Sequence, residues 1–151
     1  MPVPTIAVFV GSLRRESCNR RLALALEKLA GDRARFQYVR IDDLPLYNQD
    51  FDGSYPAQGT RLKDEVRGAD AVLFVTPEYN RSVPGVLKNA IDIGSRPYGD
   101  SAFGGKPAAV IGAPSARSAR PWPSSTCATA WPSWTCTCSA NRRRSSISRT
   151  S

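Results

Sequence analysis

Runs of consecutive apolar residues mark three segments of the chain, residues 6–10, 71–76 and 108–112. In each run the apolar positions do not alternate with polar ones, which is typical of a strand in a parallel sheet that is covered on both faces. Residues 36–41 alternate and predict a more exposed, outer strand. The pattern therefore favours a parallel sheet with at least four strands.

Helical patterns separate these strands. The first helix follows residue 19 and ends at Gly31, with an apolar stripe expected to lie on the sheet. A second is predicted over residues 60–67 and a third over residues 82–92, with Pro84 near its start. The residues expected to face inward are Leu22, Leu24, Ala25, Leu26, Leu29, Leu62, Val66, Val86, Leu87, Ala90 and Ile91. The order βαβαβαβ predicts a doubly wound α/β fold, with residues 44–56 forming a loop on the ligand-facing side.

The turn after the first strand offers groups that bind phosphate. Between Gly11 and the helix lie hydroxyl, amide and guanidinium side chains, together with the backbone N–H groups that open the helix. The spacing matches neither GxxxxGK[ST] nor GxGxxG, because Gly11 is the only glycine present. The loop thus favours a mononucleotide, as in flavodoxin-like sheets of order 2-1-3-4-5 that hold FMN. An ordinary helix cap with incidental arginines is the alternative.

A second turn, residues 77–80 (PEYN), follows the third strand and should lie beside the first. Read as structure alone, it is a strand-to-helix turn with a packed aromatic ring. Read as a site, it supplies backbone N–H groups, the Asn80 amide and the Tyr79 ring. A flat heteroaromatic ligand requires such in-plane hydrogen bonds and a covering surface.

Composition narrows the function further. The 151 residues contain no histidine, which excludes histidine triads, His-Cys zinc sites and histidine acid–base chemistry. No apolar run reaches the length of a membrane helix and no signal peptide is recognisable, so a cytoplasmic protein without a membrane partner is expected. The net charge of +8 suggests a nucleic-acid binder, but residues 1–112 contain 15 Lys and Arg against 13 Asp and Glu. Most of the excess positive charge lies in residues 113–151.

The tail, residues 113–151, differs in composition from residues 1–112, which form the predicted domain. It contains six arginines, three tryptophans and three cysteines, but no Leu, Val, Gly, Asp, Glu or Lys. If the reading frame is moved one base upstream, each Trp or Cys codon contributes its first two bases, TG, to a codon that begins with the preceding base. Every such codon encodes Leu, Val or Met. The six affected positions then have helical spacing that passes into strand spacing. We interpret the tail as an out-of-frame reading of the last helices and the fifth strand; a genuine low-complexity basic tail is the alternative.

Three segments resemble the NADPH-dependent FMN reductase family, which includes quinone, chromate and azo reductases. They are GSLRRESCNRRLA, TPEYNRSVPGVLKNAIDIGSRP and FGGKPAAVIGA, and the resemblance covers about residues 4–113. It implies that the first loop holds the FMN phosphate and that residues 77–80 lie along the isoalloxazine. The implied cofactor-binding residues are Gly11, Ser12, Leu13, Arg14, Ser17, Asn19, Arg20, Pro77, Glu78, Tyr79 and Asn80, with Arg81 and Ser82 as near neighbours.

The resemblance further implies a flavoprotein reductase that is a homodimer or homotetramer. Hydride would pass from NADPH or NADH to the flavin N5 and then to a small-molecule acceptor such as a quinone, chromate or an azo compound. No side chain is assigned to the chemical step, and no metal is expected. A flavin-binding electron carrier or sensor without turnover is the first alternative. A nucleic-acid binder acting through the arginine tail is the second, although no recognition motif accompanies the charge.

Overall fold

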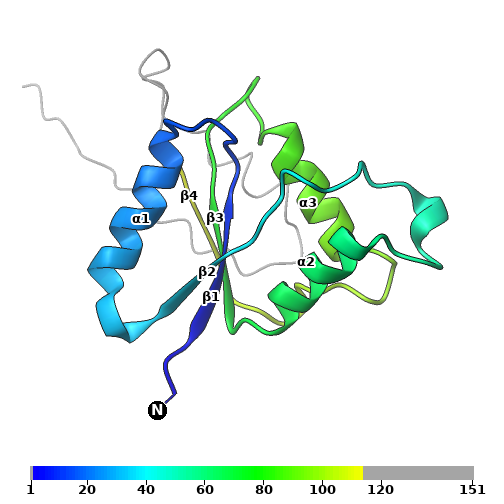
Figure 1. Cartoon of the computed structure of the whole chain (residues 1–151), viewed down its shortest axis with the longest axis horizontal. Coiled ribbons are helices and arrows are strands. Elements are labelled where there is room, and N and C mark those ends of the chain that lie inside the picture. The colour runs from blue at the N-terminus through cyan, green and yellow to red at the C-terminus, as the bar shows by residue number, and fades with distance from the viewer. Residues whose placement is uncertain (1, 114–151) are drawn as a thin grey trace, which may run out of the picture.

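The computed structural model describes residues 2–113. In this part of the chain the strands are β1 (Thr5–Val10), β2 (Arg35–Tyr38), β3 (Ala71–Val75) and β4 (Ala108–Ile111), and the α-helices are α1 (Cys18–Ala30), α2 (Ala57–Arg67) and α3 (Gly85–Ser95). Two 3₁₀ turns, Gly31–Arg33 and Gln49–Phe51, complete the regular structure. Figure 1 shows α1 on one side of the sheet and α2 with α3 on the other.

The four strands are parallel and stand in the order β2-β1-β3-β4. The predicted doubly wound α/β fold is confirmed. The predicted fifth strand lies outside the described residues, as does the out-of-frame reading of residues 114–151. Because β1 is central, its carboxyl end lies between those of β2 and β3, where ligands bind in such sheets.

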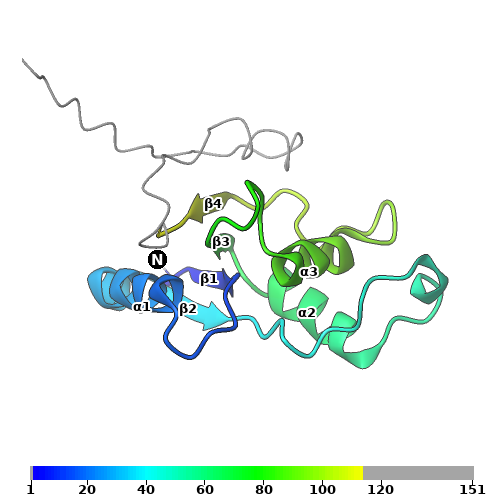
Figure 2. The same cartoon turned by 90° about the horizontal axis from the view of Figure 1, so that it is seen from above.

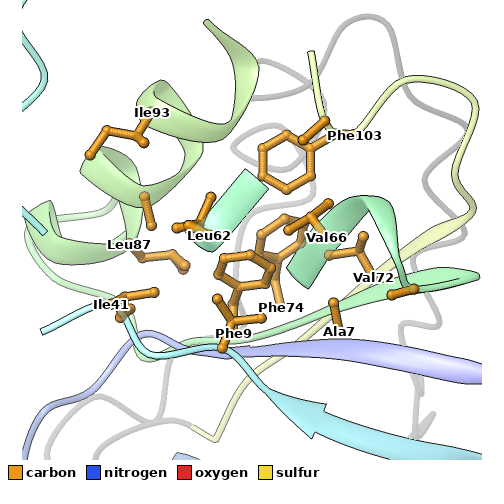
Figure 3. Packing of buried hydrophobic residues seen from close by; sticks show 14 residues of the cluster. Ala7, Phe9, Ile41, Leu62, Val66, Val72, Phe74, Leu87, Ile93 and Phe103 are labelled. Atoms are coloured by element: carbon orange, nitrogen blue, oxygen red, sulfur yellow. The ribbon is translucent and has the colours of Figure 1, made fainter. Parts of the chain in front are cut away.

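Three phenylalanines form the centre of the core between the sheet and helices α2 and α3 (Figure 3). The ring centroid of Phe9 lies 5.1 Å from that of Phe74, and Phe103 lies 6.0 and 6.1 Å from these two. Tilted pairs at such distances each contribute about 0.5–1.5 kcal/mol beyond the buried area. Leu62, Val66 and Leu87 close this core from the helices, as the apolar pattern predicted.

The opposite face of the sheet is covered by α1, but the predicted apolar stripe is partly wrong. Ala23 is fully buried and Leu22 packs against the same cluster, whereas Leu24 and Leu29 are 47% and 72% exposed. Ala25 is also exposed. The helical period puts residues 19, 22, 23 and 26 on one face, so Leu24 and Leu29 lie away from the sheet.

Several predicted boundaries shift. The outer strand ends at Tyr38 rather than residue 41, although the N–H of Val39 still donates to Val8 O at 3.0 Å. Helix α2 begins three residues earlier than predicted, at Ala57. Helix α3 begins at Gly85 rather than at residue 82, because residues 79–82 form a hairpin-like turn. Within residues 2–113, no helix is long and apolar enough to cross a bilayer.

Candidate functional site

The carboxyl ends of β1 and β3 are held together at Gly11. Its N–H donates to Val75 O at 2.9 Å, which extends the ladder one residue beyond β1. A Cβ atom on Gly11 would stand 2.8 Å from Thr76 Oγ1 and 3.1 Å from Leu87 Cδ2. Only glycine fits this close approach. Gly11 therefore fixes the predicted phosphate loop beside the PEYN turn.

The loop from Ser12 to Ser17 leads directly into the amino end of α1. Ser17 is 3% exposed, and its Oγ accepts a hydrogen bond from the N–H of Arg20 at 3.2 Å, which makes it the helix N-cap. Within the described residues, the backbone N–H groups of residues 13–16 have no protein acceptor. These N–H groups, the helix dipole and the exposed Arg14 form the donor set that a phosphomonoester requires. The loop therefore fits the phosphate of FMN.

Asn19 has a structural partner. It is 4% exposed, and its Oδ1 accepts a hydrogen bond from the N–H of Ala113 at 2.9 Å. This bond joins the first turn of α1 to the chain that leaves β4. In both Ser17 and Asn19 a side-chain oxygen thus accepts a hydrogen bond from the protein backbone. These two bonds fix the conformation of the chain around the loop.

The turn after β3 lies on the other side of Gly11. Thr76 and Pro77 are buried, Glu78 is half-buried, and Tyr79 is 50% exposed. Tyr79 and Ser82 exchange two backbone hydrogen bonds of 2.9 Å. Asn80 and Arg81 between them have φ of 52° and 62°, a tight two-residue turn that Asn tolerates better than Arg. The turn presents the Tyr79 ring to solvent beside the loop, as a covering surface requires.

The loop after β2 is also fixed at this end of the sheet. The side-chain amide of Asn89 on α3 donates to Pro45 O at 2.9 Å and accepts from the N–H of Tyr47 at 2.8 Å. This pair of bonds clamps the segment that follows the predicted outer strand. The intervening Leu46 points outward and is 81% exposed.

A cavity of about 680 Å³ lies between the loop and the chain that leaves β2. Figure 2 shows the connection from β1 to α1 passing beside the end of β2. The lining residues are Val10, Ser12, Leu13, Arg14, Arg15, Arg20, Tyr38, Val39, Arg40, Ile41 and Asp42. Four predicted site residues, Ser12, Leu13, Arg14 and Arg20, thus line it, whereas residues 77–80 do not.

Sequence reasoning missed the contribution of β2 to this cavity. Tyr38 to Asp42 and Arg15 were not among the predicted site residues. The strand order 2-1-3 was the available signal, because it places the end of β2 next to the loop. Burial, and then the hydrogen bond from Tyr38 Oη to Glu27 at 2.8 Å, raise the pKa of Tyr38 to about 12. The phenol is therefore neutral and held in place.

Comparison with known proteins agrees with this geometry. The model of the NADPH-dependent FMN reductase family matches residues 4–122. A quinone reductase of Pseudomonas putida is 60% identical over 110 residues, covering 72% of this chain and 59% of that protein. A 2-hydroxy-1,4-benzoquinone reductase of a Burkholderia species is 56% identical over 107 residues, covering 71% and 58%.

A solved structure has a similar fold. The flavoenzyme NAD(P)H:(acceptor) oxidoreductase FerB of Paracoccus denitrificans superposes with a TM-score of 0.70 at 55% identity, covering 73% of this chain and 60% of that one. The chain thus spans about three fifths of the length of each of these relatives. On the family match, the sheet order and the loop geometry, the chain belongs to the NADPH-dependent FMN reductase family.

Proposed function

We propose that the protein is an FMN-dependent NAD(P)H oxidoreductase whose acceptor is a quinone. The observation that carries the proposal is the junction at Gly11, which brings the loop of residues 12–17 and the turn of residues 77–80 to adjacent strand ends. A phosphate donor set and a flat covering surface then lie side by side. Relatives named quinone reductase support the acceptor class.

The residues of this chain would bind FMN and orient it. The N–H groups of residues 13–16 and the Arg14 guanidinium would hold the FMN phosphate, and Ser17 would keep the helix end in register. Tyr79 and the Asn80 amide would cover the ring and hydrogen-bond its edge. Bound FMN would supply the redox chemistry, taking a hydride from a nicotinamide and passing electrons to the acceptor.

Two parts of FMN lie within the proposed role of Glu78. It could hydrogen-bond the ring or the ribityl chain of FMN, since it is half-buried at the start of the turn. It does not cap α3, because Pro84 occupies the N-cap of that helix. Glu78 is therefore proposed as a ligand contact.

Chromate and azo compounds are proposed as further electron acceptors. The protein is also proposed to be a homodimer or homotetramer in the cytoplasm. Both rest on the family resemblance. Among the described residues, the charged groups at the loop serve a small anion, and no nucleic-acid recognition motif accompanies them. A role in nucleic-acid binding is not proposed.

The test is NADPH oxidation by the FMN-loaded full chain with a benzoquinone as acceptor. We expect turnover, and we expect Arg14→Gln to weaken FMN binding at least about tenfold, the effect of losing one charge-assisted hydrogen bond. Arg21→Gln is the matched control, because Arg21 lies on α1 just after the loop and does not line the cavity. Clear FMN binding with no flavin reduction would instead support a carrier or sensor.

A further inference from the structure

The turn after β3 holds an arginine in a backbone conformation that arginine disfavours. Tyr79 and Ser82 exchange two backbone hydrogen bonds of 2.9 Å, so that Asn80 and Arg81 alone form the tip of the turn. Their φ values of 52° and 62° are those of a type I′ turn. Glycine is preferred at the second of these positions, because a Cβ atom in the left-handed conformation crowds the following carbonyl oxygen. A turn selected for stability alone would carry glycine there.

No internal partner of the Arg81 side chain offsets this strain within the part of the chain that the structure describes. The residue is exposed, and its guanidinium group has neither a hydrogen-bond acceptor nor a salt bridge there. Glu78 is the single carboxylate among residues 76–86, and it forms no ion pair with Arg81. A strained residue whose charged group has no internal partner is a candidate for a functional role.

Arg81 lies next to the surface that the proposed function assigns to the flavin ring. Tyr79, two positions earlier, is 50% exposed and would cover the ring. Figure 1 shows the connection from β3 to α3 standing beyond the carboxyl end of the sheet, the same end as the loop that follows β1. That loop would hold the phosphate, at the far end of the cofactor. The Arg81 guanidinium is therefore available to a second molecule that approaches the ring.

A guanidinium group at the rim of a ring site selects for negative charge. Its N–H groups form charge-assisted, often bidentate hydrogen bonds with oxyanions. An aromatic acceptor would stack on the flat ring, so a substituent at its edge would extend toward the rim. We propose that Arg81 is a specificity-determining residue that binds an anionic substituent of an aromatic electron acceptor. The inference rests on the proposed reductase function, to which it adds a preference within the quinone class.

Three substitutions separate the charge of Arg81 from the shape of the turn. Arg81→Gly removes the guanidinium and suits the positive φ, so the turn should form at least as readily and the variant should fold. Arg81→Lys keeps a positive charge but loses the planar fork. Lys88→Gln is the control, because it removes an exposed cation of the same end of α3 that pairs with Asp92.

The test is NADPH oxidation by the FMN-loaded full chain with 1,4-naphthoquinone-2-sulfonate and, separately, with 1,4-naphthoquinone. Because the two quinones differ in reduction potential, the ratio of their kcat/KM values is compared between variants. We expect Arg81→Gly to lower this ratio at least about tenfold, the effect of losing one charge-assisted hydrogen bond, through a higher KM for the sulfonate. Arg81→Lys should keep part of the preference, and Lys88→Gln should keep all of it.

Calorimetric titration measures the same contact without turnover. The probes are naphthalene-2-sulfonate and 2-naphthol, which is neutral at about pH 7, added to the oxidised, FMN-loaded full chain. We expect Arg81→Gly to weaken binding of the sulfonate at least about tenfold and to leave binding of 2-naphthol unchanged. An equal loss of both probes would instead assign Arg81 to the shape of the turn and overturn the proposal.

The kinetic outcomes distinguish the inference from the function on which it rests. Turnover with both quinones, at a kcat/KM ratio that is the same in Arg81→Gly and in the wild type, would overturn the role of Arg81 and leave the reductase function standing. Clear FMN binding by the wild type without NADPH oxidation in the presence of either quinone would overturn both.

Discussion

Gly11 shows how one missing methyl group places a binding loop. Thr76, whose Oγ1 would meet the added Cβ, is fully buried and donates to Pro77 O at 2.9 Å. It cannot move without breaking that bond at the start of the PEYN turn. We therefore expect Gly11→Ala to cost about 1–3 kcal/mol in the free energy of unfolding, as overpacking does. FMN affinity should fall with it, because the loop and the turn shift apart.

Urea unfolding and FMN titration of Gly11→Ala measure both effects. Gly85→Ala serves as the control, since a Cβ there meets nothing within 4 Å. That substitution should be neutral or stabilise by up to about 1 kcal/mol, because Ala restricts the unfolded chain. A Gly11→Ala protein as stable as the wild type, with unchanged FMN affinity, would show that the close approach is dispensable.

At the residue scale, the sequence predicted where the loop lies better than it predicted the role of each residue in the loop. Hydroxyl and amide side chains next to a helix start are equally good as phosphate ligands or as caps, and local sequence does not distinguish the two. The structure uses Ser17 as the cap and ties Asn19 to Ala113, 94 positions away. A partner so distant in sequence is set by the strand order, and no pattern around residue 19 encodes it.

At the scale of elements, the segment that joins α3 to β4 is anchored by charge. Lys63 on α2 is 5% exposed, and its Nζ donates to Arg96 O at 2.7 Å and to Asp100 Oδ2 at 2.6 Å. Arg67 donates to the other oxygen of Asp100 at 2.5 Å. Hydrogen bonds from Lys63 and then Arg67 are the leading causes that lower the pKa of Asp100. This carboxylate holds the segment against α2.

The sign of the pH dependence follows from that lowered pKa. A depressed carboxyl pKa stabilises the fold above its unfolded value of about 3.9, and the contribution is lost as the pH falls through the lower folded value. We expect Asp100→Asn to lower the urea midpoint at about pH 7, and we expect this deficit to shrink progressively as the pH falls below about 3.9 and through the lowered pKa of Asp100 in the fold. Asp32→Asn, at a position without a salt bridge within residues 2–113, should stay near the wild-type midpoint at neutral pH. A pH-independent difference for Asp100→Asn would contradict the assignment.

Element boundaries were harder to predict than element types. The strand expected over residues 36–41 stops pairing at Tyr38 because the chain turns away there to line the cavity. The helix expected from residue 82 is delayed by the turn at Asn80 and Arg81. Both differences fall at strand ends that face the site. Apolar runs fix which segments are strands, whereas the site geometry decides where they end.

At the scale of the whole molecule, β4 is an edge strand within the described residues. Its Ile111 is half-buried on the face covered by α1, and the hydrogen bond from Ala113 to Asn19 ties the chain beyond β4 to the phosphate loop. Ala113, the last described residue, is thus linked to the first turn of α1 beside the proposed site. In a doubly wound sheet, further elements there would cover the strand edge and add a wall beside the ring.

We propose that residues 113–151, as printed, are an out-of-frame reading, and the coding DNA tests this. The composition changes at one point, and each Trp and Cys of the tail becomes an apolar residue in the neighbouring frame. Resequencing should reveal one base gained or lost near codon 113. A chain expressed in the corrected frame should bind FMN at least about tenfold more tightly, equivalent to about 1.4 kcal/mol, because the covering wall is restored. An open frame that runs intact through this region would mean that the basic tail is genuine. A corrected chain with unchanged FMN affinity would mean that the site is complete without the wall.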